Sequence, residues 1–256
     1  MIHSIRKDEY KVLFYRLLLA YVFFFVARCF FFFYNSDLIK IDSVTDFFVL
    51  YYHGLAFDTT AVLYLNGLFL LFSIVPFVIN TKKGYQKFLF YLYFIPNLLG
   101  FATNFIDFIY YRFNFGRSTI AALDSLKNES NKGILFYNFL VNYWHVFVLF
   151  FALSFLWIYL YKRVKIRYEK PVKLSGYFLT SIFGILIIAT LAIGGIRGDF
   201  QKSTRPINLL DASRYVKNPS QADFVLNTPF TIIRTMFSNN FEKLTLVDQK
   251  TIDSLI

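Results

Sequence analysis

Five long apolar runs, each able to cross a lipid bilayer, constrain this chain more than any other feature of its sequence. A helix rises about 1.5 Å per residue, so about 20 apolar residues cross a hydrocarbon core of about 30 Å. Hydrophobic residues make up 57% of the chain and charged residues only 17%, which excludes an ordinary soluble domain. The sequence predicts an all-α integral membrane domain over residues 1–196, with spans near 13–34, 47–79, 88–111, 136–161 and 177–196.

The first two runs need separate interpretation. The first is not a cleaved signal peptide, because it is longer than a usual signal core, carries Arg28 and lacks a following small-residue cleavage site. The second run is longer than a bilayer requires, and its first part carries His53 and Asp58. We therefore expect an interfacial or bent lead-in before a true span that begins near Thr59.

The distribution of lysine and arginine predicts the orientation, because cytoplasmic loops carry the excess. The N-terminal arm and the second and fourth short loops hold twelve, whereas the first and third short loops hold five. The N-terminus is therefore expected in the cytoplasm. With five spans, the tail at 197–256 would then lie outside the cytoplasmic membrane, as an extracytoplasmic helical connector in a bacterial inner-membrane protein.

Composition limits the other functional classes. The single Cys29 excludes an internal disulfide and a cysteine-cluster metal site, and three scattered histidines are too few for a zinc centre. The net charge of +11 does not indicate nucleic-acid binding, because the basic residues lie between apolar runs. We expect no nucleic-acid partner, and membrane lipids as the immediate partners.

Several polar residues within the spans have a structural interpretation. Arg16 and Arg28 lie near opposite ends of the first span, where their side chains are expected to reach the headgroups. Asn66, Asn97 and Asn104 are expected to form hydrogen bonds between helices.

Two carboxylates inside the spans are the strongest site candidates, because a short acidic side chain cannot reach far toward water. Asp58 enters the second span and Asp107 leaves the third, so both are expected near the same membrane face. With Arg112 or Arg117 they would line one polar pocket that holds a lipid headgroup. The equally weighted alternative is a pair of helix-end carboxylates solvated by headgroup water.

Shorter helices are predicted outside the spans. The loop 113–135 has an apolar-polar rhythm that is typical of a short amphipathic helix on the membrane surface. In the tail, Pro206 would begin a helix that runs through Tyr215, and Thr228 followed by Pro229 would cap a helix that runs through Met236. The tail has too little apolar surface for its own core, so we expect these helices to pack on the membrane or on another domain.

Five segments, taken in order, resemble a known family. They are GLAFD at 54–58, FIDFIYYRF at 105–113, IRG at 196–198, RPINLLDASRYV at 205–216 and ADFVLNTPFTIIRT at 222–235. With the five spans, they resemble the N-terminal half of the lipoteichoic acid synthase-like, sulfatase-domain membrane proteins, in the version found in Bacteroidetes-type bacteria. The resemblance covers nearly the whole chain.

The resemblance implies a membrane anchor and connector, followed by an exported domain of the alkaline phosphatase superfamily. That domain would transfer phosphoglycerol or phosphoethanolamine, or hydrolyse sulfate esters, with a Thr or Ser nucleophile beside Mn or Mg. A lipid-linked substrate is a further implied partner.

This chain lacks the residues that such chemistry requires. After Arg197 it has no histidine, and its only acids are Asp199, Asp211, Asp223, Glu242, Asp248 and Asp253. We therefore assign it no catalytic, cofactor-binding or metal-binding residue and expect it to be inactive alone, with the catalytic domain beyond Ile256.

Two other functions remain open. A free-standing transporter or channel would usually show repeated halves, and the five spans, with Pro76 and Pro96 near two span ends, show no repeat. A membrane regulatory partner, with its tail outside, is the third hypothesis.

Overall fold

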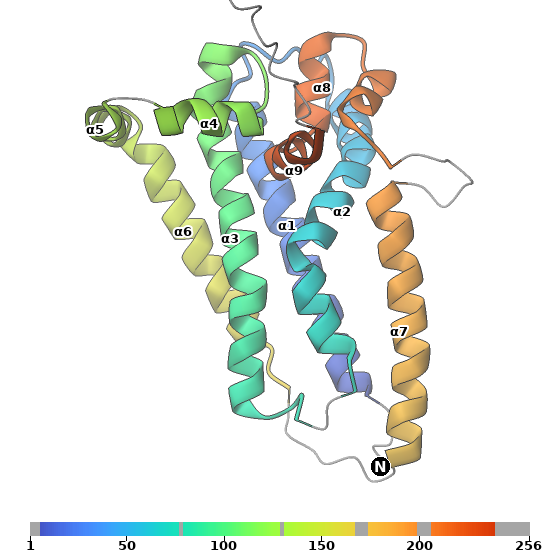
Figure 1. Cartoon of the computed structure of the whole chain (residues 1–256). Helices are drawn as coiled ribbons and strands as arrows, with labels where there is room; N and C mark the ends of the chain where they lie inside the picture. The colour runs from blue at the N-terminus through green and yellow to red at the C-terminus, as the bar shows by residue number, and fades with distance from the viewer. Residues whose placement is uncertain (1–5, 77–78, 129–130, 167–173, 199–205, 239–256) are drawn as a thin grey trace, which may run out of the picture.

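The computed structural model describes residues 6–76, 79–128, 131–166, 174–198 and 206–238, and these ranges form a bundle of helices (Figure 1). In these ranges the chain is helical and contains no strand. The helices are α1 (Lys7–Tyr34), α2 (Val44–Ile74), α3 (Lys83–Asn114), α4 (Ile120–Asn128), α5 (Lys132–Asn142), α6 (Trp144–Arg163), α7 (Leu174–Arg197), the 3-10 helix η1 (Leu209–Tyr215), α8 (Pro219–Val225) and α9 (Thr228–Ser238).

The five helices α1, α2, α3, α6 and α7 are long and apolar enough to cross a membrane, which confirms the expectation of five long apolar helices in the described part of the chain. The lead-in expected before Thr59 is part of one continuous helix, α2. With 31 residues, α2 is about 46 Å long, so its ends extend beyond a hydrocarbon core of about 30 Å.

The fourth apolar run differs from the expected span at 136–161. The helix that could cross the membrane starts at Trp144, and residues 132–142 form the separate helix α5, which turns away from α6 (Figure 1). Helical geometry is interrupted at Tyr143, whose φ and ψ are −122° and 27°. α5 buries none of its described side chains, as expected for an apolar helix that lies along a membrane surface.

The helices α1, α2 and α3 pack against one another, and α6 packs on α3 and α1. The core between them is mainly aromatic. Trp157 of α6 is fully buried and stacks on Phe23, with ring centroids 4.4 Å apart. Its Nε1 donates to the hydroxyl of Tyr93 over 2.9 Å, so this indole also satisfies its polar atom.

Buried amides join α2 and α3, as the sequence predicted. The Nδ2 of Asn66 donates to the Oδ1 of Asn97 over 3.0 Å, and the Nδ2 of Asn97 donates back over 2.7 Å. Near this pair, a Cβ on Gly100 would lie 2.6 Å from Leu65, so a glycine allows the two helices to approach closely.

The tail helices η1, α8 and α9, called here the connector (residues 206–238), lie at the end of the bundle opposite the N-terminus (Figure 1). We call this the connector end. The helix expected from Pro206 is a 3-10 helix that starts at Leu209, because Asn208 and Asp211 form a capping box there. The helix expected from Thr228 is confirmed as α9, and the amphipathic helix expected in the loop 113–135 is α4.

The connector buries its apolar side chains against the five long helices rather than in a core of its own. α8 and α9 both pack on α2, and α9 also packs on α3 and α4. Phe224 packs on Phe47 of α2 with tilted rings whose centroids are 5.0 Å apart, and Phe230 contacts Phe57 of α2 edge to face, also at 5.0 Å. His53, near the start of α2, stacks on Tyr215 with ring centroids 4.0 Å apart.

Candidate functional site

The junction between α8 and α9 is the most polar buried region of the described chain. α8 ends at Val225 and α9 begins at Thr228, so the carbonyl end of one helix faces the same short segment as the amide end of the next. Helix ends carry backbone groups without an intrahelical partner. Buried in a membrane protein, these groups need partners from elsewhere, and the bundle supplies them.

Arg28 of α1 binds the carbonyl end of α8. Its Nη1 contacts the carbonyl oxygens of Phe224, Val225 (2.7 Å) and Leu226 (3.0 Å). Its Nη2 forms a buried ion pair and hydrogen bond with Asp58 of α2. A cation beside helical carbonyls also interacts favourably with the negative end of the helix dipole.

Arg117, in the loop that follows α3, binds the same carbonyl end from the other side. Its Nε donates to the carbonyl of Asp223 over 2.8 Å, and its Nη2 donates to that of Leu226 over 3.0 Å. The guanidinium lies over the ring of Phe31, 3.4 Å from the centroid. Burial lowers the pKa of Arg117 to about 10, and the charge of Asp107 opposes this shift, so the side chain is a cation at neutral pH.

The carboxylate of Asp107 accepts hydrogen bonds at the N-terminal end of α9. It accepts from the hydroxyl of Thr228 over 2.6 Å and from the backbone N–H and hydroxyl of Ser118, and it lies 3.7 Å from the Nη1 of Arg117. The Thr228 N–H itself donates to the Oδ1 of Asn104. A negative charge is stabilising near a helix N-terminus.

Asp58 reaches the same junction through Asn227. The Nδ2 of Asn227 donates to Asp58 over 2.7 Å, while its Oδ1 caps α9 by accepting from the N–H of Phe230. We call Arg28, Asp58, Asn104, Asp107 and Arg117 the socket. Its arginines donate to carbonyls at the end of α8, and its acidic and amide groups accept from donors at the start of α9. Buried ion pairs need such additional hydrogen bonds, and among the socket arginines the Nε of Arg28 has no described acceptor.

The socket gathers three of the four site residues that the sequence predicted. Asp58, Asp107 and Arg117 lie around one junction, each less than a tenth exposed. Arg112 is not among them, because it lies on the surface and pairs with the exposed Asp37 at 2.9 Å. Asp58, Asp107 and Arg117 each form hydrogen bonds with the connector. A pocket for a lipid headgroup remains a prediction.

Sequence reasoning missed several socket residues. Arg28 was expected to reach the headgroups, yet it is only 3% exposed and points into the bundle. Asn104 was expected to form a hydrogen bond between helices and does so, since its Oδ1 accepts from the N–H of Thr228 in α9, but its place in this site was not predicted. The predicted helix start at Thr228-Pro229 was the available signal, because the backbone donors of a buried helix start need acceptors nearby; the residue that caps the helix is Asn227, one position earlier than predicted.

Asp223, on α8, is a titratable group at the edge of the socket. Burial raises its pKa to about 6, while the charge of Arg117 and a hydrogen bond from the hydroxyl of Tyr111 oppose this shift and the charge of Asp107 adds to it. The Tyr111 hydroxyl lies 3.3 Å from the Asp223 carboxylate. The junction therefore contains one carboxylate that titrates in mildly acidic solution.

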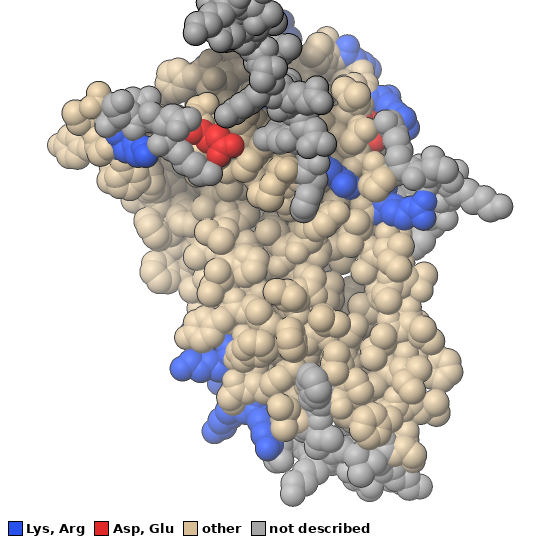
Figure 2. Space-filling view, viewed as in Figure 1, with Lys and Arg blue, Asp and Glu red and all other residues tan. Residues whose placement is uncertain are grey.

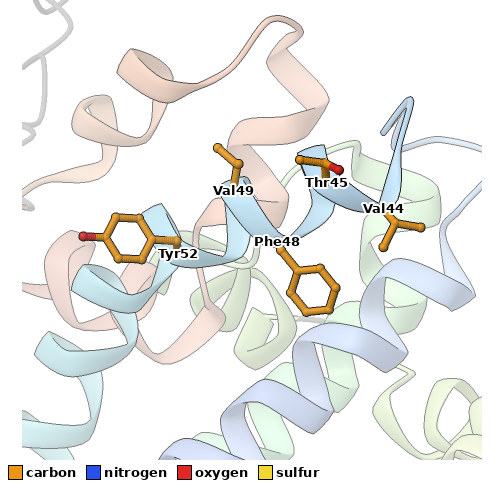
Figure 3. Close-up of a pocket in the computed structure, with 5 residues that line it drawn as sticks. All are labelled: Val44, Thr45, Phe48, Val49 and Tyr52. Atoms are coloured by element: carbon orange, nitrogen blue, oxygen red, sulfur yellow. The ribbon is translucent and has the colours of Figure 1, made fainter.

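Two surface depressions near the connector end contain no constellation for catalysis. The larger, about 390 Å³, is lined by one face of α2: Val44, Thr45, Phe48, Val49 and Tyr52 (Figure 3). The other, about 240 Å³, lies among α1, α3 and α6 and includes His145. In the part of the chain that the structure describes, no three histidine, cysteine or acidic side chains group as metal ligands.

Comparisons with protein-family models, with curated proteins and with solved structures found no match to this chain. The geometry therefore defines the class on its own: a bundle with five helices able to cross a membrane, and a connector held in a buried polar socket at one end.

Proposed function

We propose that this chain is the membrane anchor and connector of a sulfatase-like enzyme of the bacterial cell envelope. The enzyme would transfer phosphoglycerol or phosphoethanolamine, or hydrolyse sulfate esters, in a domain joined after the connector. The resemblance of the sequence motifs suggests this function, and the socket is the structural observation that supports it. Any Mn or Mg would be bound by that domain and not by this chain.

The socket suits an anchor because it fixes where the chain leaves the bundle. A flexible linker would let an attached domain move over a wide volume. Here the α8–α9 junction is bound by Arg28 and Arg117, with Asp107 at the start of α9. The bundle therefore fixes the point from which the chain continues toward a domain that follows α9.

The proposed orientation places the N-terminus in the cytoplasm and the connector on the extracytoplasmic side. The excess of lysine and arginine in alternate loops supports it. Within this arrangement Arg112 is the predicted headgroup ligand with the most accessible charge, since its side chain is 37% exposed. Arg112 is therefore the residue of this group that a lipid or lipid-linked substrate beside the exported domain could contact most directly.

Cysteine labelling in intact cells tests the orientation. In a Cys29→Ser background, Leu210→Cys lies on the exposed surface of η1 and Lys162→Cys lies near the opposite end, on α6. A membrane-impermeant maleimide is expected to label Leu210→Cys and to label Lys162→Cys only after permeabilisation. The reverse pattern would contradict the proposed orientation.

Activity assays test the proposed enzyme class. The coding sequence beyond the Ile256 codon would be read, and the joined polypeptide assayed on nitrophenyl phosphodiesters and sulfate esters with Mn or Mg. We expect hydrolysis by the joined polypeptide and none by residues 1–256 alone. Hydrolysis by residues 1–256 would refute the anchor assignment, and an unrelated downstream sequence would favour a membrane regulatory partner.

A further inference from the structure

Four arginines are buried in the described chain: Arg6, Arg16, Arg28 and Arg117, each at most 7% exposed. Three of them have protein acceptors. Arg28 and Arg117 bind the connector and pair with aspartates, and Arg6 binds Glu9 and the carbonyl of Ile74. Arg16 is the exception, and it lies on α1 twelve residues before Arg28, toward the N-terminal end of the bundle.

The Arg16 guanidinium has no counter-charge among the described residues. No ion pair there includes it, its Nε is a buried donor without an acceptor, and no described group accepts from its terminal nitrogens. Among the described residues, the side chain that contacts this guanidinium is the ring of Tyr161, 4.2 Å from the guanidinium carbon. An unpaired buried cation is costly, so this arrangement points to an anion that completes it.

A second unpartnered donor lies beside Arg16. The hydroxyl of Tyr161 is buried and has no described hydrogen-bond partner. The neighbouring Tyr93 is satisfied, because it donates to the Arg16 carbonyl over 2.8 Å and accepts from Trp157. At this junction of α1, α3 and α6 the guanidinium can only donate and the Tyr161 hydroxyl is able to donate, so the two groups suit a ligand that accepts hydrogen bonds.

The depth of the junction indicates where the anion comes from. Tyr161 lies two residues before the end of α6 at Arg163, so Arg16 is about one helical turn from that end. Lys162 lies next to it, with its ammonium 5.3 Å from the centroid of the Phe90 ring. Lysine and arginine side chains gather near the lower ends of α3 and α6 in Figure 2. Basic side chains near a membrane surface attract anionic lipid headgroups.

We propose that the junction of α1, α3 and α6 binds the phosphate of an anionic phospholipid from the leaflet at the N-terminal end of the bundle. The planar guanidinium of Arg16 matches phosphate oxygens in a bidentate manner, the Tyr161 hydroxyl donates a further bond, and Lys162 adds positive charge. This site is separate from the socket and does not depend on the proposed enzyme class.

Lipid titration of the purified, delipidated chain tests the site. Phosphatidylglycerol is the probe, phosphatidylcholine the neutral lipid control and inorganic phosphate the free-anion control, with bound lipid counted by native mass spectrometry. We expect one tightly bound phosphatidylglycerol, with about tenfold weaker binding in Arg16→Gln, because charged hydrogen bonds are lost. The matched control, Arg163→Gln, removes the same charge from the exposed end of α6 and is expected to bind as the wild type does.

Thermal unfolding separates a ligand role from a structural one. In micelles without phospholipid, Arg16→Gln is expected to be at least as stable as the wild type, because the substitution removes an uncompensated buried charge. Added phosphatidylglycerol is expected to stabilise the wild type but not Arg16→Gln. If Arg16→Gln does not fold, Arg16→Lys and Tyr161→Phe replace it, and both are expected to bind more weakly.

Three results would overturn the proposal. They are wild-type affinity in the Arg16 and Tyr161 variants, an equal loss of affinity in Arg163→Gln, and stabilisation by inorganic phosphate that matches that of the lipid.

Discussion

Arg117→Met is the perturbation that most directly tests the energetics of the socket. Methionine keeps an apolar chain over Phe31 but removes the donors to the carbonyls of Asp223 and Leu226. The substitution also leaves the fully buried carboxylate of Asp107 without the positive charge of Arg117. Removing one partner of a buried ion pair costs about 3–5 kcal/mol, so we expect a loss of about 4 kcal/mol in the free energy of unfolding.

The matched control is Arg112→Met, which removes an arginine five residues earlier. The Arg112–Asp37 pair is exposed, with side-chain exposures of 37% and 57%. Exposed pairs contribute about 0–1 kcal/mol, so this variant is expected to lose no more than about 1 kcal/mol. The difference between the two variants isolates burial, because both lose one positive charge near the same end of the bundle.

A denaturant titration in mixed micelles, followed by tryptophan fluorescence, measures both variants. Adding Asp107→Asn to Arg117→Met should recover about half of the loss, because a neutral amide at this position still accepts from the Ser118 N–H but leaves no unpaired charge. The reasoning is refuted if Arg117→Met costs no more than Arg112→Met, or if the double variant is less stable than Arg117→Met alone.

Three further predictions concern the rest of the described bundle. Asn66→Leu is expected to cost about 1–2 kcal/mol because it leaves the buried Oδ1 of Asn97 without its donor, and Asn66→Leu with Asn97→Leu should recover most of that loss in the same titration. Gly100→Val is expected to cost about 1–3 kcal/mol by pushing Leu65 out of place, whereas a valine at the open position Gly67 should cost under about 1 kcal/mol. The pKa of Asp223, raised by burial to about 6, lies above the usual value of about 4, so the folded state holds its proton more tightly. The free energy of unfolding should therefore fall as the pH rises from about 4 to about 6, and Asp223→Asn should remove that slope.

Hydrophobic length predicted the long helices because crossing a bilayer demands a minimum run of apolar residues. The break at Tyr143 was not predictable in this way, since the apolar character of the sequence continues through it. α5 and α6 differ in orientation rather than in composition. A residue count detects apolar length but not a change of helix direction from the membrane surface into the bundle.

Local capping signals predicted α9 at Thr228, but they did not predict what α9 packs against. The pairing of Arg28 with Asp58 joins two helices, and the pairing of Arg117 with Asp107 joins a loop to a helix. The carbonyls that both arginines bind come from a segment more than a hundred residues away. Such contacts depend on tertiary arrangement, so the sequence marked the carboxylates as unusual without identifying their partners.

Hydrogen exchange of the backbone amides, with the full chain in lipid nanodiscs, tests the central claim that the socket holds the connector. We predict that the amides of Leu226, Phe230 and Thr231 exchange as slowly as those in the middle of α3. In the Arg28→Met, Arg117→Met double variant, the connector amides should exchange rapidly while those of α6 stay protected. Rapid exchange of the connector in the wild type, or unchanged protection in the double variant, would contradict the account.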